Sequence, residues 1–317
     1  MTIQNRFIVA LVVVILAGVS LYPIIHRVRS ARVRRSWGWL ITLVLLVLGA
    51  WVSQPLAPWP RLGVVWALVF VAFKALVLTH TEPTALVGLT WWRYCGFVAG
   101  WLGMDIAAWI VPTAPVAAGW RRVLSGSAWL LGAGGLSWLL LRWPVAAAWA
   151  LPRAWCAWVA GVIAVFFGFT RLLTGIWNVL GRNVAPLFDA PVYARSLTEW
   201  WGKRWNLAVH TTLHLVIWQP LRGRFGTAGA ATAVFLVSGL LHEYLLSYPA
   251  NGGWGGPIAY FVIQAAGMYA EHKRAVRRIL RVAAWRKAAW TLVITLVPGP
   301  LLFHPALLEA LVMPLGR

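Results

Sequence analysis

Two ionisable residues lie in the middle of an apolar run that is long enough to cross a bilayer. His242 and Glu243 interrupt the run formed by residues 230–248. Ionisable groups at such a depth are costly, and they tend to mark function. A neutral imidazole is the least costly of them to bury, and it is a competent general base. His242 is therefore the first candidate for chemistry.

Helical spacing divides the neighbours of His242 between two faces. Ser238 precedes His242 by four residues and shares its face, where it could orient the imidazole. Gly239 shares the face of Glu243 in the same way. Glu243 points about 100° away from His242 around a helix, so we expect it to pair with an arginine or to line a polar tunnel. A histidine that only packs between helices remains an alternative interpretation.

A second polar segment, dense in tryptophan and cations, lies upstream of this run. It consists of Glu199, Trp200, Trp201, Gly202, Lys203, Arg204, Trp205 and Asn206. The amide of Asn206 can donate a hydrogen bond to a carbonyl oxygen as that atom becomes an oxyanion. Lys203 and Arg204 carry the charge that binds phosphate groups. An interfacial anchor of tryptophan and arginine is the alternative interpretation of these residues.

The other metal-binding residue types give weaker signals. His210 and His214 are four residues apart, so a helix places them on one face, as a metal site requires. No glutamate accompanies them and no third ligand is placed by spacing, which favours a polar stripe on an amphipathic helix. Cys95 and Cys156 show neither metal spacing nor a disulfide framework. We expect no metal site and no cofactor.

The composition shows where these residues must be positioned. The chain has 317 residues, of which 61% are hydrophobic and 11% charged, whereas soluble domains carry roughly 25% charged residues. The apolar runs are continuous and do not alternate with polar residues, which favours helices over a membrane barrel. We therefore predict an all-α, polytopic helical bundle in a membrane.

The apolar runs predict about eight spans. They cover residues 7–25, 39–52, 62–78, 127–141, 154–169, 230–248, 257–270 and 288–303. Two more apolar segments, 96–111 and 207–221, are spans or else broken and in-plane helices. The basic clusters at 27–35, 171–204 and 273–287 should face the cytoplasm. Eight spans place all three basic clusters on the cytoplasmic side if residues 207–221 do not cross the membrane fully. The amino terminus then lies outside.

The formal net charge of +21 points to an anionic partner. Nucleic acid is one such partner for a basic protein. In a chain this apolar, cytoplasmic flanks that face anionic membrane lipids explain the charge better, and they leave room for an anionic ligand. We therefore expect anionic lipids as partners and no nucleic acid. The sequence does not set an oligomeric state.

Taken together, the polar segments resemble the wax synthase branch of the membrane-bound O-acyltransferases. The resemblance is carried by Pro186-Leu187-Phe188, by Ser196-Leu197-Thr198-Glu199-Trp200-Trp201-Gly202-Lys203-Arg204-Trp205-Asn206 and by Ser238-Gly239-Leu240-Leu241-His242-Glu243. Lys203 stands where the family commonly has arginine. A weaker echo lies at Trp92-Arg93-Tyr94 and at Gly100-Trp101-Leu102-Gly103-Met104-Asp105, where Leu102 replaces a proline. The good match covers residues 171–249.

The resemblance implies transfer of a fatty acyl group from acyl-CoA to a hydroxyl acceptor within the membrane. The acceptor would be a long-chain alcohol or similar lipid, and the product a wax-type ester. By position, the two key polar residues of the family correspond to His242 and Asn206. We expect six residues to bind substrate or acyl-CoA, which is a co-substrate: Lys203, Arg204, Trp201, Trp205, Ser238 and Glu243. In the family, a tunnel brings the thioester and the alcohol to the histidine from opposite sides.

The expected organisation is a single membrane-embedded acyltransferase domain over residues 1–317, with N-terminal helices in 1–125 and core motifs in 171–249. The expected location is a bacterial inner (cytoplasmic) membrane. Two other functions stay open at this point. One is O-acylation of an exported polysaccharide or another acceptor. The other is a transporter, which the intramembrane histidine and glutamate would also suit.

Overall fold

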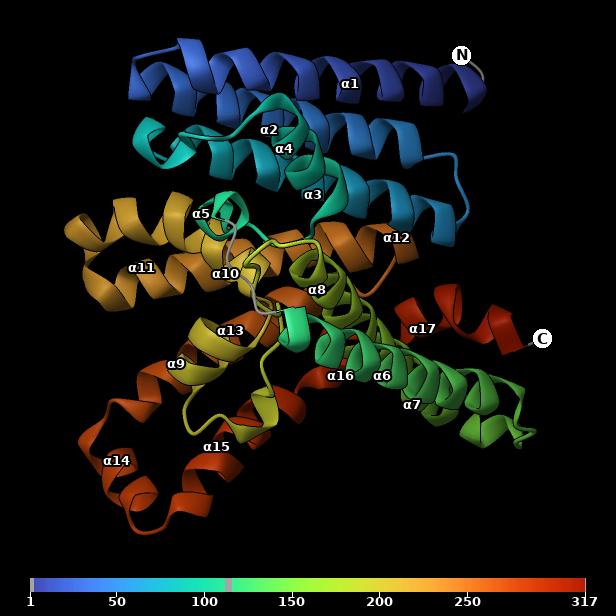
Figure 1. Ribbon diagram of the computed structural model, residues 1–317. Helices are drawn as coiled ribbons and strands as arrows, with labels where there is room; N and C mark the ends of the chain where they lie inside the picture. Colours follow the sequence, from blue (N-terminus) through green and yellow to red (C-terminus); the bar gives the residue numbers. More distant parts are fainter. Residues whose placement is uncertain (1–2, 112–115, 317) are drawn as a thin grey trace. The chain divides into compact units, whose positions relative to one another are not determined.

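The protein is all-helical, as predicted. A computed structural model describes residues 3–111 and 116–316, and no strand occurs in these two ranges (Figure 1). The chain divides into two compact units, which are described separately. Unit 1 consists of residues 1–114 and 181–184, and unit 2 of residues 115–180 and 185–317.

Unit 1 contains three long helices followed by short ones. They are α1 (Ile3–Arg27), α2 (Ala31–Ser53), α3 (Pro58–His80), α4 (Trp91–Cys95) and α5 (Ile106–Ile110). Ser30 begins α2 as its N-cap, because its hydroxyl accepts a hydrogen bond from the backbone N–H of Val33. Pro58 begins α3, where a missing N–H costs nothing.

A fully buried lysine organises the short helices of unit 1. The Nζ of Lys74, in the middle of α3, donates to the carbonyl of Gly103 over 2.5 Å and lies 3.5 Å from the ring centroid of Phe97. The weaker motif echo at residues 101–105 is thus attached to α3. Asp105 caps α5 by accepting from the N–H of Ala108. This part of the motif serves the local fold of unit 1.

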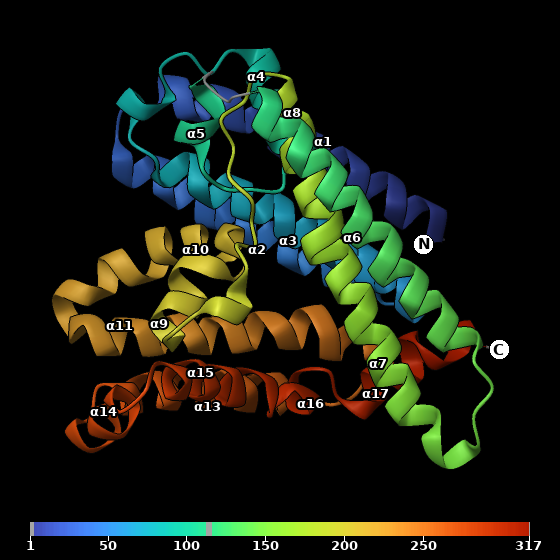
Figure 2. The same ribbon diagram turned by 60° about the horizontal axis from the view of Figure 1, so that its bottom comes forward.

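Unit 2 holds both polar segments that the sequence singles out. Its helices are α6 (Val116–Arg142), α7 (Ala150–Ile163), α8 (Thr170–Val179), α9 (Leu197–Glu199), α10 (Leu207–Leu213), α11 (Gln219–His242), α12 (Tyr248–Ala250), α13 (Gly256–Glu271), α14 (Arg274–Arg281), α15 (Ala284–Leu296), α16 (Gly299–Leu302) and α17 (Pro305–Leu311). In Figure 2, α6 runs beside α7 and α8, while α11 runs along α13.

Wide π-helical turns join several of these helices end to end. They are η4 (Ala164–Phe169) between α7 and α8, η6 (Trp200–Arg204) after α9, η7 (His214–Trp218) between α10 and α11, and η8 (Glu243–Ser247) after α11. Such turns are rare and often occur at functional sites. Two of the four contain residues that the sequence selects for chemistry.

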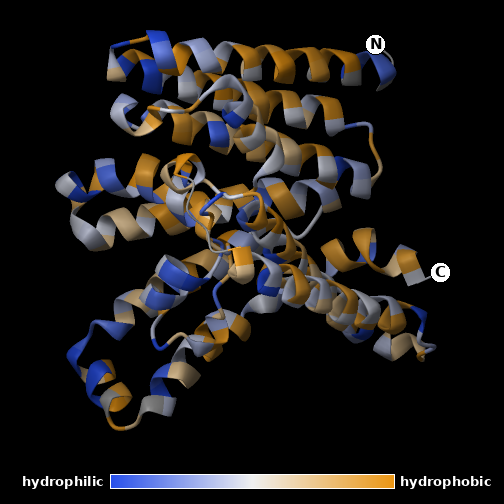
Figure 3. Ribbon diagram, viewed as in Figure 1, coloured by the Kyte–Doolittle hydropathy of each residue, from blue (hydrophilic) through white to orange (hydrophobic). Residues whose placement is uncertain are grey.

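Six helical stretches are long and apolar enough to cross a membrane. They are Gln4–Arg27, Ala31–Ser53, Pro58–His80, Val116–Arg142, Ala147–Val179 and Leu207–Ala250. A bent pair, Trp285–Leu302 with Pro305–Leu311, raises the number to seven if it is one span. The multi-pass prediction is confirmed, and the number of spans stays approximate. Figure 3 shows hydrophilic residues gathered on α14, outside these stretches.

The stretch Leu207–Ala250 is two arms rather than one straight helix. At 44 residues and about 1.5 Å per residue it would be far longer than a bilayer is thick. Gly226, with φ 69° and ψ 176°, breaks it in a conformation that is essentially open only to glycine. In Figures 1 and 2 the chain turns back at this end of α11. The arm ending in His242 is thus distinct from the arm that begins after Asn206.

Candidate functional site

The imidazole of His242 is held by a backbone carbonyl at the end of α11. Its Nδ1 lies 2.7 Å from the carbonyl oxygen of Ser238. A carbonyl can only accept, so Nδ1 carries the hydrogen, and the Nε2 of the neutral ring keeps a free lone pair. The predicted shared face of Ser238 and His242 is confirmed, but the carbonyl orients the ring rather than the hydroxyl.

The surroundings of His242, rather than this bond, distinguish it from other histidines. His80 and His272 make the same hydrogen bond to the carbonyl four residues earlier. The ring of His242 alone among these three packs on Phe261 of α13, with centroids 4.7 Å apart. Phe261 in turn contacts Phe235 and Trp201. His242 is half-buried beside an aromatic cluster, which is a water-poor setting for proton transfer.

No arginine among the described residues pairs with Glu243, so the arginine partner that we expected is wrong, whereas a place in a polar tunnel stays a prediction. The side chain of Glu243 is buried, and its Oε1 accepts the backbone N–H of Gly255 over 2.8 Å and that of Ile258 over 3.3 Å. These N–H groups belong to the start of α13, whose first turn has no partners of its own. Glu243 is therefore a helix cap supplied by a neighbouring helix. Gly239 shares its face, as predicted, and approaches α13 closely.

The tryptophans of the upstream segment connect it to His242. Trp201 and Trp205 have ring centroids 6.4 Å apart, and Trp205 stacks on Trp200 at 5.3 Å. Trp201 lies 5.7 Å from Phe261, which touches the imidazole. Its indole N–H donates to Gln264 over 3.3 Å. Both predicted tryptophans thus lie in the aromatic cluster that reaches His242.

Asn206 marks the sharp turn between η6 and α10. Its backbone is left-handed, with φ 42° and ψ 62°, which asparagine tolerates better than most residues. The side-chain oxygen caps α10 by accepting from Val209 over 3.4 Å. No described residue accepts from its amide N–H groups or bonds it directly to His242. The connection between the two runs through Trp205, Trp201 and Phe261.

The two cations of the segment have different environments. The Nε of Arg204 donates to Glu199 over 2.7 Å, and its Nη1 donates to the carbonyl of Asp189 over 3.0 Å. Lys203 is exposed. The backbone N–H of Arg195 and then the guanidinium of Arg204 hold the pKa of Glu199 below its ordinary value. Arg204 is therefore engaged within the fold, whereas Lys203 faces outward.

Three residues of the site were not selected from the sequence. Glu199 holds Arg204, Phe261 packs on His242, and Gln264 receives the indole N–H of Trp201. The pattern Ser196-x-x-Glu199 is a capping signature, and Ser196 indeed accepts from the N–H of Glu199 over 3.0 Å. A glutamine within the otherwise apolar run 257–270 was a second available signal. Nothing local singled out Phe261.

The rings of His210 and His214 lie next to each other and are tilted by 34°. Their ring centroids are 5.6 Å apart, and His214 stacks on Trp218 at 4.6 Å. Within residues 3–111 and 116–316, no three His, Cys, Asp or Glu side chains are grouped to hold a metal ion.

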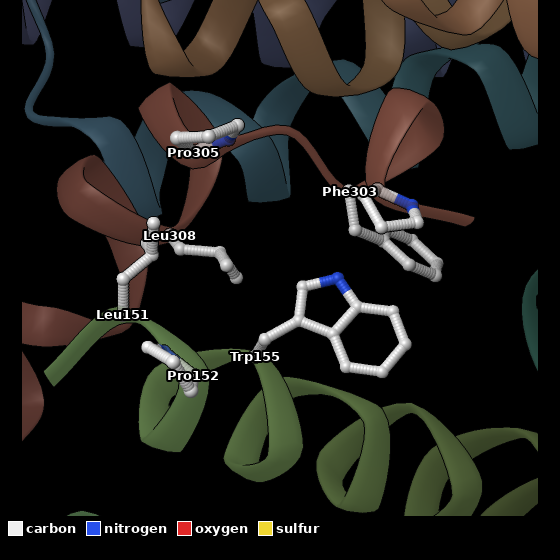
Figure 4. A pocket seen from close by; sticks show the side chains of 7 residues that line it. Leu151, Pro152, Trp155, Phe303, Pro305 and Leu308 are labelled. Carbon is white, nitrogen blue, oxygen red and sulfur yellow. The ribbon is translucent and has the colours of Figure 1, made fainter. Parts of the chain in front are cut away.

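A cavity in unit 2 lies apart from the predicted residues. It has a volume of about 210 Å³ and is lined by Leu151, Pro152, Trp155, Pro300, Phe303, Pro305 and Leu308. Figure 4 shows the indole of Trp155 in the middle of this apolar lining. The cavity contains no titratable side chain, so it offers no acid or base for catalysis.

Known proteins match the segment that contains this site. Residues 184–263 match the membrane bound O-acyl transferase family. A long-chain-alcohol O-fatty-acyltransferase from Simmondsia chinensis is 35% identical over 142 residues, which are 41% of this chain and 40% of that protein. The probable long-chain-alcohol O-fatty-acyltransferase 7 of Arabidopsis thaliana is 28% identical over 163 residues, 47% of each chain.

A relative with a different acceptor in its name also matches. The acyl-CoA–sterol O-acyltransferase 1 of Arabidopsis thaliana is 37% identical over 73 residues, 21% of each chain. The matched regions thus span less than half of the length of these relatives. The resemblance to the wax synthase branch of the membrane-bound O-acyltransferases is confirmed over the segment that carries His242 and Asn206.

Proposed function

We propose that this multi-pass membrane protein is an O-acyltransferase that moves a fatty acyl group from acyl-CoA to a lipid alcohol. The observation that carries the proposal is the placement of His242, whose ring packs on Phe261 in the aromatic cluster that contains Trp201. The Nδ1–H of His242 is committed to the Ser238 carbonyl, so the Nε2 lone pair is free to take a proton. The names of the relatives supply the reaction class, and Phe261 and Trp201 supply an apolar setting for it.

In the proposed reaction, His242 acts first as a base and then as an acid. Its Nε2 removes the proton of the alcohol as the alcohol oxygen attacks the thioester carbonyl. The tetrahedral adduct collapses when the carbon–sulfur bond breaks, and the imidazolium returns the proton to the departing CoA thiolate. Acid–base help of this kind typically supplies about 10²–10⁴-fold in rate. No covalent acyl-enzyme is needed.

Asn206 is the proposed donor to the developing oxyanion. Its amide oxygen is occupied by the cap of α10, which leaves the N–H groups directed elsewhere. A single donor of this type is typically worth about 10²–10³-fold in rate. In this proposal the thioester carbonyl lies between Asn206 and His242, which no hydrogen bond joins in the described part of the chain.

The proposed acyl-CoA contacts divide according to the environment of each side chain. Lys203 is exposed and can reach a CoA phosphate. Arg204 already serves Glu199 and Asp189, so its contribution would be to hold η6 in place. Trp201 and Trp205 would form an apolar wall beside the acyl chain, and Ser238 would act through its carbonyl.

The proposed setting is a bacterial inner membrane, with anionic lipids on the cytoplasmic side. The cationic surface of α14, on which Arg274, Arg277 and Arg278 are all exposed, supports the anionic lipids in this proposal. Juxtamembrane cations of this kind are attracted to anionic headgroups. The relatives named above are plant proteins.

Lipid ester synthesis is favoured over the two alternatives. The transporter hypothesis relied on two intramembrane ionisable residues, and the carboxylate of Glu243 is engaged as a helix cap. The polysaccharide hypothesis has no observation in its favour. The test is to reconstitute the protein in lipid vesicles with labelled palmitoyl-CoA and either hexadecanol or a sterol. Formation of a labelled ester supports the proposal, and absence of any ester with both acceptors contradicts it.

A further inference from the structure

We infer that Glu243 is a positioning residue for His242 and acts through helix α13. The inference rests on the proposed acyl transfer, in which Glu243 itself touches no substrate. A buried carboxylate in a membrane segment is costly unless it makes compensating contacts. Those contacts lie on α13, the helix whose Phe261 packs against the imidazole.

The first step is the attachment of Glu243 to the start of α13. Its Oε1 accepts two backbone N–H groups, from Gly255 at 2.8 Å and Ile258 at 3.3 Å. The N-terminal end of a helix carries a partial positive charge, which favours a carboxylate there. Its Oε2 is buried and makes no hydrogen bond within the described residues. The carboxylate is therefore committed to the backbone of α13.

The second step is the close packing that limits how α13 can move. Gly239, in α11, lies one turn before Glu243, the first residue of η8, and both contact the start of α13. A β-carbon at Gly239 would lie 3.0 Å from the Cα of Ile258. The two helix backbones are thus in near contact beside the carboxylate, and they leave little freedom except sliding or rotation of α13. The hydrogen bonds of Glu243 oppose both motions.

The third step is that residues of α13 contact both His242 and the upstream tryptophan segment. Residues 258, 261 and 264 are three apart, so Ile258, Phe261 and Gln264 follow one face of the helix. Phe261 packs on His242, and Gln264 binds the indole of Trp201. At its other end, Glu271 accepts the backbone N–H of Leu197 over 2.9 Å. One helix thus fixes both polar segments, and Glu243 fixes the start of that helix.

The first test measures the attachment without any use of activity. Hydrogen exchange at the amides of Gly255 and Ile258 is compared in wild type, Glu243→Ala and Glu243→Gln. We expect exchange to be at least about tenfold faster in Glu243→Ala, since a buried hydrogen bond is lost. In Glu243→Gln the amide oxygen still accepts, so the logarithm of the exchange rate should rise by less than half as much. Equal exchange in wild type and Glu243→Ala overturns the inference.

A matched control comes from the same π-helical turn. Ser247 lies four residues after Glu243, and its hydroxyl contacts the Nε2 of His304 over 3.3 Å. His304 caps α17, not α13. Ser247→Ala should therefore leave exchange at Gly255 and Ile258 unchanged. Equal acceleration in Ser247→Ala and Glu243→Ala would mean that loosening of the turn, not loss of the carboxylate, is responsible, and this outcome too overturns the inference.

The second test asks whether the attachment acts through Phe261. Acyl transfer is measured for Glu243→Ala, Phe261→Leu and the double variant. Each single change should lower kcat about tenfold and leave the KM for palmitoyl-CoA within about twofold, with substantial recovery in Glu243→Gln. The double variant should be no slower than the slower single variant, because both act on one route. Losses that multiply to about a hundredfold overturn the inference. An inactive wild type contradicts the proposed reaction instead, and the exchange test still decides the attachment.

Discussion

Replacing Arg204 by alanine distinguishes a structural role from a phosphate-binding role. The guanidinium donates to Glu199 over 2.7 Å and to the Asp189 carbonyl over 3.0 Å. The side chains of Arg204 and Glu199 are 25% and 27% exposed, so water partly screens the ion pair between them. We expect Arg204→Ala to lower the free energy of unfolding by about 1–2 kcal/mol, in the range for partly exposed hydrogen bonds to charged groups.

Lys203 is the matched control, because it is the adjacent residue, has the same charge and is exposed. Lys203→Ala should change the free energy of unfolding by less than about 0.5 kcal/mol, as is usual for surface positions. If it binds a CoA phosphate, the KM for palmitoyl-CoA should rise severalfold. Thermal unfolding in detergent and steady-state kinetics in vesicles measure the two quantities on the same variants.

The pH dependence follows from the lowered pKa of Glu199. A carboxylate whose pKa is lower in the folded state stabilises the fold above its unfolded pKa, and this stabilisation is lost as the pH falls through the folded value. The stability difference between wild type and Arg204→Ala should therefore shrink at acid pH. An Arg204→Ala protein with wild-type stability at pH 7 and a raised KM would refute this reasoning.

Two further predictions concern Gly226, which the sequence did not mark, and Asn206, which it did. Gly226→Ala should destabilise the protein by about 1–3 kcal/mol, because a φ of 69° strains any residue with a β-carbon. No atom would clash with the new methyl group, so the loss would come from backbone strain alone. Gly223→Ala, which has ordinary φ and equal space, should be neutral or stabilising in the same thermal unfolding assay, and equal effects of both would contradict the strain argument. Asn206→Ala should lower kcat about 10²–10³-fold, and a rate within tenfold of wild type would remove it as the oxyanion donor. Asn206→Asp keeps the cap of α10 but replaces the N–H donors by a carboxylate oxygen. This variant should therefore be no more active than Asn206→Ala.

The part of the site that could be predicted from the sequence is the part set by helical periodicity. A spacing of four residues placed Ser238 beside His242 and Gly239 beside Glu243. In the structure Ser238 bonds His242, and Gly239 and Glu243 both contact Ile258 at the start of α13. The same spacing cannot say whether a hydroxyl or a carbonyl meets the imidazole. Local backbone bonding favoured the carbonyl, as it also does at His80 and His272.

The residues that were missed depend on contacts between elements distant in the chain. The partners of Glu243 are backbone N–H groups twelve and fifteen residues later, across a turn whose path the sequence does not specify. An arginine partner was the natural expectation for a buried carboxylate, whereas the free N–H groups of α13 satisfy it. Phe261 is one of many apolar residues, and only the packing of α11 on α13 selects it.

The break at Gly226 is a feature of the fold that the sequence pattern did not predict. Residues 207–250 are apolar over most of their length, and they contain several glycines that a helix tolerates. Only Gly226 has a mirror-β conformation, whereas Gly223 and Gly229 stay within helix. The apolar pattern thus predicted both helical arms, but composition did not identify the glycine at which the chain turns.

The most direct test of the central claim is the acyl transfer rate of His242→Gln compared with His272→Gln. Both histidines bond the carbonyl four residues earlier, but only His242 packs on Phe261. With palmitoyl-CoA and the acceptor that wild type uses, His242→Gln should lose about 10²–10⁴-fold in kcat. His272→Gln should remain within about twofold of wild type. An unchanged rate in His242→Gln would contradict its role as the base of the reaction.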